Sequence, residues 1–554
     1  MHRFLPLLVA LPLALPATAQ RQSHNAEVAR SLDVFNAIYR DLDLYYVDTL
    51  DARQRIEDAT AYMLEQLDPY TEYYPEDATS DLRQLTTGKY AGSGSAILYK
   101  KAADRCIISE PYEGMPAAEA GLLPGDVILS IGGTDIPPCG TTPVRDYTSD
   151  VSSRLRGDAG TSFDIRVRRP STGRTLTIRL TRRNITMPSV TLRKMVADSV
   201  GYVHVTQFVE GTAAELRRAV TALKEQGARS LVLDLRGNPG GVIDEAVKMV
   251  NLFIPRGREV VSTRGKVKES NNTYRTTADP LDTAIPLVVM VDNYSASASE
   301  ITSGALQDYD RAVVLGRRTY GKGLVQASRE LPYKGILKLT SAKYYIPSGR
   351  CVQAYEFKDG QPVARPDSLA CTFRTANGRP VRDGGGVTPD VKVVADSLPH
   401  LIGYLEASDQ LFDYCVDYHA RHPRIAHPSE FRLTDEEYAD FTAYLKEHGF
   451  TYDRQSLRVL HTLRDVARFE GYDADAADEL NALEAKFRRN EDNDFRRWEK
   501  EVREVVERRI VESYYYQNGG EEYMLRSDRD LERAIRLLAT PAEMRRILSG
   551  EPEA

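Results

Sequence analysis

The sequence is poor in cysteine and carries no excess of positive charge, and both absences exclude classes of function. It has five cysteines in 554 residues, and no two of them are spaced as C-x-x-C. Neither a zinc ribbon nor a thiol–disulfide exchange motif is therefore indicated. The formal net charge is −7, so the chain lacks the basic field that nucleic-acid-binding proteins usually present.

Long apolar runs are also missing, apart from one at the start of the chain. Residues 4–16 are apolar, follow Arg3, and precede the small residues Ala-Thr-Ala at 17–19. This arrangement is typical of a secretory signal (residues 1–19), cleaved after Ala19. The alternative, a membrane anchor, requires a longer run than this one, which prolines interrupt. We expect an exported, periplasmic protein of the Gram-negative type that is soluble after cleavage.

Export permits disulfide bonds between cysteines that are close in sequence. Cys106 with Cys139, and Cys351 with Cys371, are therefore disulfide candidates. The odd count leaves at least one thiol unpaired within the monomer, which is Cys415 if both pairs form. The alternative is that all five cysteines are ordinary thiols.

The chain is too long for a single compact core, and its patterning predicts an α+β multidomain protein. Residues 20–82 repeat apolar residues at helical steps, and a second helix there should stop at Asp68-Pro69. In 83–183, short β-like runs alternate with glycine and proline turns. Strands alternate with helices in 184–398, which predicts a mixed α/β core. Residues 399–554 are charged and helical in pattern.

One loop of the predicted core nearly matches a phosphate-binding motif but lacks its last residue. Residues 316–323 read GRRTYGKG, and Gly323 replaces the Ser or Thr that would hold a magnesium ion. Histidine is missing as well, because none occurs between His204 and His400. A nucleophile in this part of the chain would need another base, and a neutral lysine can serve.

Three serines, Ser295, Ser297 and Ser299, follow an apolar strand in the same zone. A helix that begins here directs free N–H groups and the positive end of its dipole at these hydroxyls. That environment stabilises a developing oxyanion, so it is suitable for a nucleophilic serine. Plain helix capping by serine is the commoner alternative.

Lys322 lies between two glycines and is followed by Leu324 and Val325. Burial among apolar neighbours would lower the pKa of its amine from about 10.4 to roughly 7–8, where lysine acts as a base. The alternative is an ordinary loop cation in water.

These motifs together resemble one known family. The segments LVLDLRGNPGG (231–241), SASASE (295–300), GRRTYGKGLVQ (316–326) and GGGVTPD (384–390) are similar to those of the carboxyl-terminal processing proteases, also called tail-specific proteases. The matching motifs span roughly residues 35–395. The resemblance implies a crotonase-like α/β protease core at 184–398 that uses neither metal nor cofactor.

The resemblance also implies a role for each matching residue. Ser297 is the nucleophile, Lys322 is the general base, and Gln326 positions the lysine. Ala298 supplies one backbone donor of the oxyanion hole. The other comes from the glycine turn, from Gly240 or Gly241, and the sequence does not decide between them.

Glu300 lies three residues after Ser297, on the same helix face. A carboxylate beside Lys322 would favour the protonated amine, so we do not expect Glu300 to assist the base. A first-turn residue that the helix dipole favours is an equal alternative.

Residues 111–133 resemble a PDZ domain, which we expect to span 83–183. PDZ domains add a peptide's C-terminal end as a strand to a sheet edge, and backbone N–H groups hold its carboxylate. The candidate carboxylate loop is Gly92-Ser93-Gly94-Ser95, directly before a predicted strand at 96–99. The expected partners are proteins or peptides with free, apolar, disordered C-termini.

The sequence thus predicts an exported serine endopeptidase that reads the substrate's tail and cleaves through a Ser/Lys dyad and an acyl-enzyme. One alternative is an inactive, PDZ-based peptide-binding scaffold. Another is a Ser–His hydrolase that recruits His204. For the helices of 399–554, packing on the core, homo-oligomerisation and adaptor binding all remain open.

Overall fold

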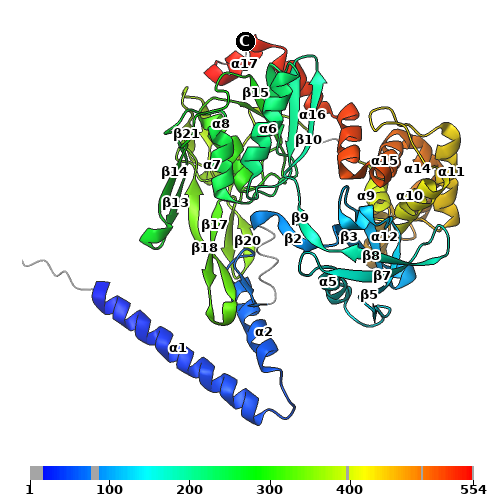
Figure 1. Cartoon of the computed structure of the whole chain (residues 1–554), viewed down its shortest axis with the longest axis horizontal. Helices are drawn as coiled ribbons and strands as arrows, with labels where there is room; N and C mark the ends of the chain where they lie inside the picture. The colour runs from blue at the N-terminus through cyan, green and yellow to red at the C-terminus, as the bar shows by residue number, and fades with distance from the viewer. Residues whose placement is uncertain (1–16, 77–85, 395–397, 488–490, 552–554) are drawn as a thin grey trace, which may run out of the picture. The chain divides into compact units, whose positions relative to one another are not determined.

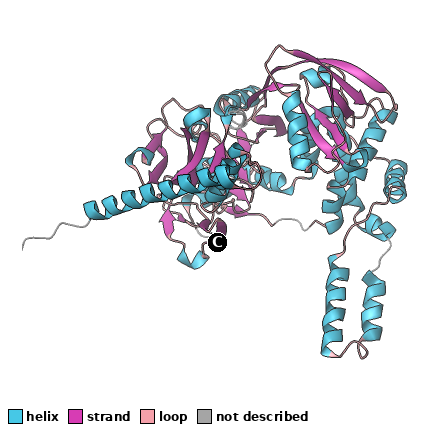
Figure 2. Cartoon of the chain, turned by 90° about the horizontal axis from the view of Figure 1, so that it is seen from below, coloured by secondary structure: helices cyan, strands magenta, loops and turns pink. Residues whose placement is uncertain are grey.

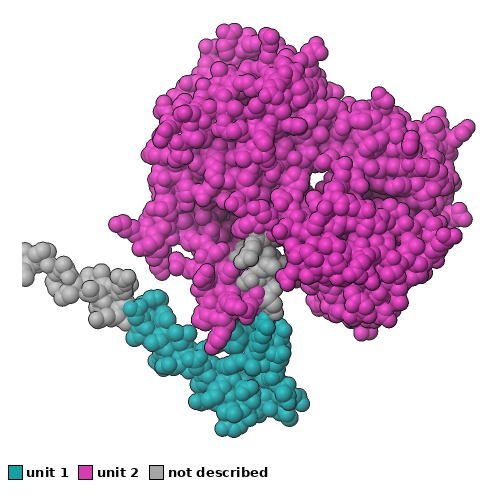
Figure 3. Space-filling model, viewed as in Figure 1, with its two compact units in different colours: residues 1–73, 357–361 teal, residues 74–356, 362–554 magenta. Residues whose placement is uncertain are grey.

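The computed structural model describes residues 17–76, 86–394, 398–487 and 491–551. The chain divides into two compact units, Met1–Tyr73 with Phe357–Gln361 and Tyr74–Glu356 with Pro362–Ala554 (Figure 3). Most of the predicted signal segment lies outside the described residues. Among the helices that are described, none has both the length and the apolarity needed to cross a bilayer.

The first unit contains two helices, α1 (Ala17–Tyr45) and α2 (Ala52–Glu65). Asp51 caps α2 by accepting a hydrogen bond from the Gln54 N–H at 3.0 Å. The helix ends just before the predicted stop. The helical pattern was therefore read correctly, but the apolar residues of α1 are exposed, with Leu32 58% and Ile38 56% accessible.

A six-stranded sheet forms the centre of the second unit. Its strands, in spatial order, are β10 (Val190–Ala197), β11 (Val200–Val205), β12 (Ser230–Asp234), β15 (Leu287–Val291), β16 (Val313–Gly316) and β23 (Val391–Lys392). All neighbours are parallel except β10 with β11. Because parallel strands end at the same edge, the loops after β12, β15 and β16 meet there.

Helices cover both faces of this sheet (Figure 1). One face packs on α6 (Thr212–Glu225), α7 (Ile243–Asn251) and α8 (Ala298–Asp308). The other face packs on α16 (Arg529–Leu538) and α17 (Pro541–Ser549). Burial on both faces explains why the central strands read as continuous apolar runs. The last two helices of the chain therefore belong to the core of this sheet.

A second sheet lies beside the first and is antiparallel. Its strands β17 (Leu324–Glu330), β18 (Ile336–Tyr345), β13 (Glu259–Gly265) and β14 (Asn272–Arg275) follow one another in that order. The far end of α8 is anchored by an ion pair between Asp308 and Arg350, 2.9 Å apart and both inaccessible to solvent. The other short strands are β1 (Glu72–Tyr74), β19 (Tyr355–Lys358), β20 (Gln361–Ala364), β21 (Thr372–Arg374) and β22 (Pro380–Arg382).

A third sheet occupies the zone in which glycine and proline turns were noted. Its order is β3 (Ser95–Lys100), β4 (Arg105–Pro111), β5 (Val127–Ile131), β7 (Ser162–Arg168) and β8 (Thr175–Thr181), with β6 (Thr134–Asp135) beside β5. The helices α4 (Pro116–Glu119) and α5 (Val144–Leu155) accompany it. The strands that enter and leave this zone, β2 (Lys89–Gly92) and β9 (Arg183–Thr186), pair with each other.

The chain after the core is helical (Figure 2). One hydrophobic cluster is shared by α9 (His400–Glu406), α10 (Asp409–Arg421), α11 (Asp435–Glu447), α14 (Glu491–Arg497) and α15 (Glu499–Met524). The remaining two helices, α12 (Gln455–Glu470) and α13 (Ala477–Phe487), pack against each other. The helix α15 is broken at Tyr516, whose φ of 58° and ψ of −168° are not helical.

The disulfide prediction is wrong, because all five cysteines are free thiols in the structure. Cys106 and Cys139 both lie in the hydrophobic core of the third sheet, but their sulfurs face the Thr148 hydroxyl at 3.9 Å and the Thr142 carbonyl at 3.2 Å. Closeness in sequence did not supply the geometry that a disulfide requires. Neither is a bond formed between Cys351, which is half-buried, and Cys371, which is exposed.

Candidate active site

Five of the six residues predicted for catalysis and the oxyanion hole line one cavity of about 690 Å³, and the sixth, Ala298, is fully buried at the start of α8. Ser297 precedes α8, Lys322 and Gln326 lie at the start of β17, and Gly240 and Gly241 end the turn after β12. The three loops that bring them together leave the carboxyl ends of the adjacent parallel strands β12, β15 and β16. This edge is where parallel sheets usually place a ligand site.

The three serines have different tasks. The Ser295 hydroxyl donates to the Leu235 carbonyl at 2.8 Å, and the Ser299 hydroxyl donates to the Asn238 carbonyl at 2.9 Å. Both therefore fasten the start of α8 to the turn after β12. Ser297 lines the cavity instead, with φ of 54° and ψ of −111°. Such a backbone conformation is strained for a residue with a side chain and is typical of functional positions.

The glycine turn packs directly against Ser297. A Cβ atom on Gly240 would lie 2.7 Å from the Cβ of Ser297, so this position requires glycine. Buried Asn238 holds the turn from inside: its Nδ2 donates to the Val205 carbonyl at 2.7 Å, and its Oδ1 accepts the Gly240 N–H at 2.8 Å. For the Gly241 N–H, the described residues provide no acceptor.

Glu300 connects the serine to the lysine loop. Its side chain is fully buried and accepts four hydrogen bonds, from the N–H groups of Ser297 (2.9 Å), Gly321 (2.7 Å) and Lys322 (2.8 Å) and from the Thr319 hydroxyl (2.6 Å). Burial raises the pKa of this carboxyl above its ordinary value, and the four hydrogen bonds oppose that rise. The expectation of a plain first-turn residue missed this linking role.

The lysine loop is also held from the side of the second sheet. The Gly323 N–H donates to Gln353 Oε1 at 2.6 Å, and the Ala354 N–H donates to the Gly321 carbonyl at 2.8 Å. Gln326 Nε2 donates to Thr340 Oγ1 on β18 at 3.1 Å, which fixes the side chain beside the cavity. Sequence reasoning did not single out Gln353 or Asn238. Asn238 directly follows motif Gly237 in the sequence, which is a signal that could have found it. Gln353 adjoins Gly323 only in the folded chain, so no sequence pattern marked it.

His204 does not line this cavity. Its Nδ1 lies 3.1 Å from Glu521 Oε2 on α15 and 3.2 Å from the Thr191 hydroxyl, and its Nε2 lies 3.4 Å from the Arg236 carbonyl. Burial lowers the pKa of His204, but the hydrogen bond to Glu521 and the charges of Asp234 and Glu521 outweigh burial and raise the pKa to about 9. The histidine is therefore an ion-pair partner of α15.

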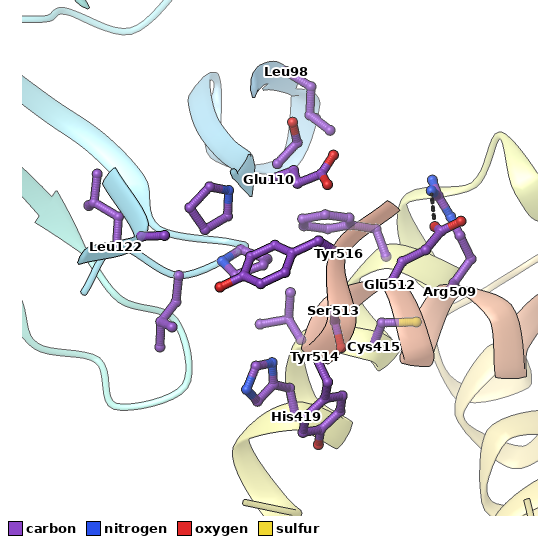
Figure 4. Close-up of a pocket in the computed structure, with 17 residues that line it drawn as sticks. Leu98, Glu110, Leu122, Cys415, His419, Arg509, Glu512, Ser513, Tyr514 and Tyr516 are labelled. Atoms are coloured by element: carbon purple, nitrogen blue, oxygen red, sulfur yellow. Dashed lines mark hydrogen bonds and ion pairs between the residues drawn. The ribbon is translucent and has the colours of Figure 1, made fainter. Parts of the chain in front are cut away.

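A second cavity, of about 490 Å³, lies between the third sheet and the helices α10 and α15 (Figure 4). Tyr516 and Leu122 are among its lining residues, and Gln517 Nε2 donates to Glu110 Oε2 at 3.0 Å beside it. His419, one of three clustered histidines, stacks on Tyr514 with ring centres 4.2 Å apart. No predicted catalytic residue lines this cavity.

The fold and the cavity define a class, the serine peptidases that carry a PDZ domain. Peptidase family S41 matches residues 199–362, a PDZ domain matches 107–169, and the C-terminal helical domain of a probable PDZ-protease matches 401–538. These three matches fall on the central sheet, the third sheet and the helices that follow.

Curated relatives agree with that class. A carboxy-terminal-processing protease of Bartonella bacilliformis is 34% identical over 364 residues, which cover 65% of this chain and 81% of the relative. A probable CtpA-like serine protease of Staphylococcus aureus is 33% identical over 340 residues, covering 61% of this chain and 65% of that protein. The chain belongs to peptidase family S41 and is a serine peptidase.

Among solved structures, a photosystem II D1 C-terminal processing protease is 28% identical, with 65% of this chain and 87% of that chain covered and a TM-score of 0.34.

Replacing Glu300 by Gln tests the link between the two loops. In the wild type, four donors converge on the two carboxylate oxygens of Glu300. Glutamine has only one acceptor oxygen, and its NH₂ group would face two of the four donors. Each orphaned donor costs about 1–3 kcal/mol, so we expect a lower melting temperature and at least a tenfold loss of kcat on a peptide substrate. Glu330→Gln, exposed at the end of β17, is the matched control. Unchanged kcat in Glu300→Gln would contradict the linking role.

The ion pair of His204 predicts a dependence of stability on pH. Its folded pKa of about 9 lies above the ordinary 6.5, so the folded chain binds more protons between these values. The stabilisation, on the order of 3 kcal/mol, is complete below pH 6.5 and is lost as the pH rises through 9. In Glu521→Gln this decline should be smaller and begin at lower pH. Urea unfolding across the range and an NMR titration of His204 measure it, and titration near 6.5 in the wild type would refute it.

Proposed function

We propose that this chain is an exported endopeptidase that binds the free C-terminal tail of a protein substrate with its PDZ domain and cleaves peptide bonds through a Ser297/Lys322 dyad. The observation that carries the proposal is the shared cavity of these two side chains, which lie on loops that Glu300 joins. The names of the relatives, which describe carboxy-terminal processing, support the same substrate class. The parallel order β11-β12-β15-β16-β23 supports a crotonase-like core.

The dyad would act in two steps. Neutral Lys322 accepts the proton of the Ser297 hydroxyl while the oxygen attacks the substrate carbonyl carbon. The protonated lysine then gives that proton to the leaving amine, and an acyl-enzyme ester forms on Ser297. A water molecule, deprotonated by the same amine, hydrolyses the ester and releases the serine. No step of this sequence calls on a metal or a cofactor.

The tetrahedral intermediate needs two N–H donors near its oxyanion. We assign them to Ala298, at the start of α8, and to Gly241. Gly241 is favoured over Gly240 because the Gly240 N–H is already donated to Asn238 Oδ1 at 2.8 Å. Gly240 would then serve by allowing the turn to approach Ser297 closely.

The proposed binding of a peptide tail by the PDZ domain rests on an edge strand and a loop. Within the third sheet, β3 pairs only with β4, and α5 lies beside it. The candidate loop Gly92–Ser95 connects β2 to β3, and its carbonyls at Ser93 and Gly94 accept the N–H groups of Ala117 and Tyr112. A peptide that adds to β3 would place its carboxylate at this loop. Export to the periplasm is proposed from residues 1–19 alone.

The dyad predicts a clear pattern of mutant activities. Ser297→Ala and Lys322→Ala should each lower kcat on a peptide with an apolar, disordered C-terminus by about 10⁴-fold or more. Lys322→Arg should be equally inactive, because arginine does not lose its proton. His204→Gln should retain activity. Cleavage is followed by mass spectrometry, with melting temperatures as the control for folding.

Two results would contradict the dyad. Full activity of Ser297→Ala would show that Ser297 is not the nucleophile. Selective loss of activity in a folded His204→Gln would favour the Ser–His alternative. A wild type that binds tails but never cleaves them would favour the inactive scaffold.

Recognition of the tail predicts a preference for a free carboxylate. A peptide with a free C-terminus should be cleaved with at least tenfold higher kcat/KM than the same peptide carrying a C-terminal amide, because backbone N–H groups hold the charge. Deleting residues 95–181, which keeps the paired strands β2 and β9, should abolish the difference between the two peptides. Equal cleavage of both peptides by the full chain would refute tail recognition.

A further inference from the structure

An arginine lies at the beginning of two of the three loops that carry catalytic groups. Arg236 opens the glycine turn after β12, and Arg317 opens the Lys322 loop after β16. Neither is among the residues that line the active-site cavity. The Arg317 N–H donates to the Val291 carbonyl at 3.0 Å, and the Arg236 N–H donates to Asp234 Oδ1 at 2.9 Å.

Both arginines contact the acidic first turn of α16, which lies more than two hundred residues later in the chain. Arg236 Nη2 lies 2.6 Å from Asp528 Oδ2, and Arg236 Nη1 lies 3.5 Å from Asp530 Oδ2. Arg317 Nη2 lies 3.8 Å from the same oxygen of Asp530. The side chains of Asp528 and Asp530 are each only 13% exposed. Asp234 completes the cluster on the side of the sheet, 2.6 Å from Arg236 Nη2.

Stability alone is a weak explanation for this cluster. The helix α16 is already docked by Leu531, Ala534 and Leu537, which are buried against the central sheet. Largely buried ion pairs contribute little net stability, because desolvation offsets their attraction. A guanidinium that donates to two carboxylates is, however, held in one orientation, because its planar fork of N–H groups fits such partners in few geometries.

The orientation of each arginine matters because only a short stretch of backbone connects it to a catalytic group. Arg236 lies five residues before Gly241, and Arg317 lies five residues before Lys322. Oxyanion donors and bases lose efficiency when displaced by about 1 Å. A rigid anchor at the start of each loop limits that displacement.

We propose that Asp528 and Asp530 are positioning residues of the catalytic centre. Through Arg236 they orient the turn that supplies the oxyanion donor, and through Arg317 they orient the loop that carries Lys322. The first turn of α16 thereby sets the distance between the two halves of the active site. This inference rests on the proposed peptidase function.

Asp528→Asn is the main test, because it removes the charge and keeps the cap: an asparagine oxygen still accepts the Leu531 N–H that Asp528 Oδ1 accepts at 3.0 Å. We expect kcat on a peptide substrate to fall about tenfold or more while KM changes less than about twofold. Binding of a peptide aldehyde, which forms a tetrahedral adduct with Ser297, should weaken in parallel. Asp530→Asn should act in the same direction and less strongly.

Glu532→Gln is the matched control, because Glu532 lies on the same helix and is 57% exposed. It should leave kcat and aldehyde binding unchanged. Arg236→Lys, which keeps the cation but not the fork, should reproduce the loss of kcat. It decides the question if Asp528→Asn fails to fold.

The possible failures can be told apart. If Asp528→Asn lowers the melting temperature but leaves kcat and aldehyde binding at wild-type values, the ion pairs only hold the helix and this inference is overturned. If the wild type shows no Ser297-dependent cleavage, the proposed function falls and this inference falls with it. If the wild type cleaves and Arg236→Lys equals it, only this inference is lost.

Discussion

The buried carboxylate of Glu300 is the interaction on which the catalytic geometry depends. It is the point where the start of α8 and the lysine loop share hydrogen-bond partners, because its two oxygens accept from Ser297, Gly321, Lys322 and Thr319. A charge in this position is costly unless it is fully satisfied. The fold meets that requirement with backbone N–H groups, which side-chain motion cannot withdraw. The strained backbone of Ser297 is held in place by the same bond.

The central sheet explains why such distant segments meet at all. The parallel strands β12, β15 and β16 deliver the glycine turn, the serine and the lysine loop to one edge, although 86 residues separate Arg236 from Lys322. Further polar contacts then fix the loops against one another: Asn238 inside the turn, Ser295 and Ser299 between turn and helix, and Gln353 behind the lysine loop. The site is therefore preorganised by hydrogen bonds between buried polar side chains and the loop backbone, which suits chemistry that stabilises a developing charge.

Much of this was predictable from the sequence, for identifiable reasons. The central strands and α6 follow from apolar runs and from Gly227 after the helix, and the grouping of Ser297, Lys322 and the glycine turn follows from motifs that a family resemblance interprets. The linking role of Glu300 was missed, because a first-turn acid has the same pattern whether it faces water or a second loop. The disulfide prediction failed because sequence distance carries no information on side-chain geometry. The exposed apolar stripe of α1 shows the same limit, since periodicity predicts a helix but not the partner that covers it.

The C-terminal helices were the least readable part of the sequence, and the structure shows that they do not form one separate block. The helices α16 and α17 complete the hydrophobic core of the central sheet. The helix α15 touches both neighbouring regions within a few residues: Gln517 donates to Glu110 of the PDZ domain, and Glu521 pairs with His204 of the central sheet. Both contacts lie on the part of α15 that follows the break at Tyr516. The charged tail of the sequence thus contacts both the PDZ sheet, through Gln517, and the central sheet, through Glu521.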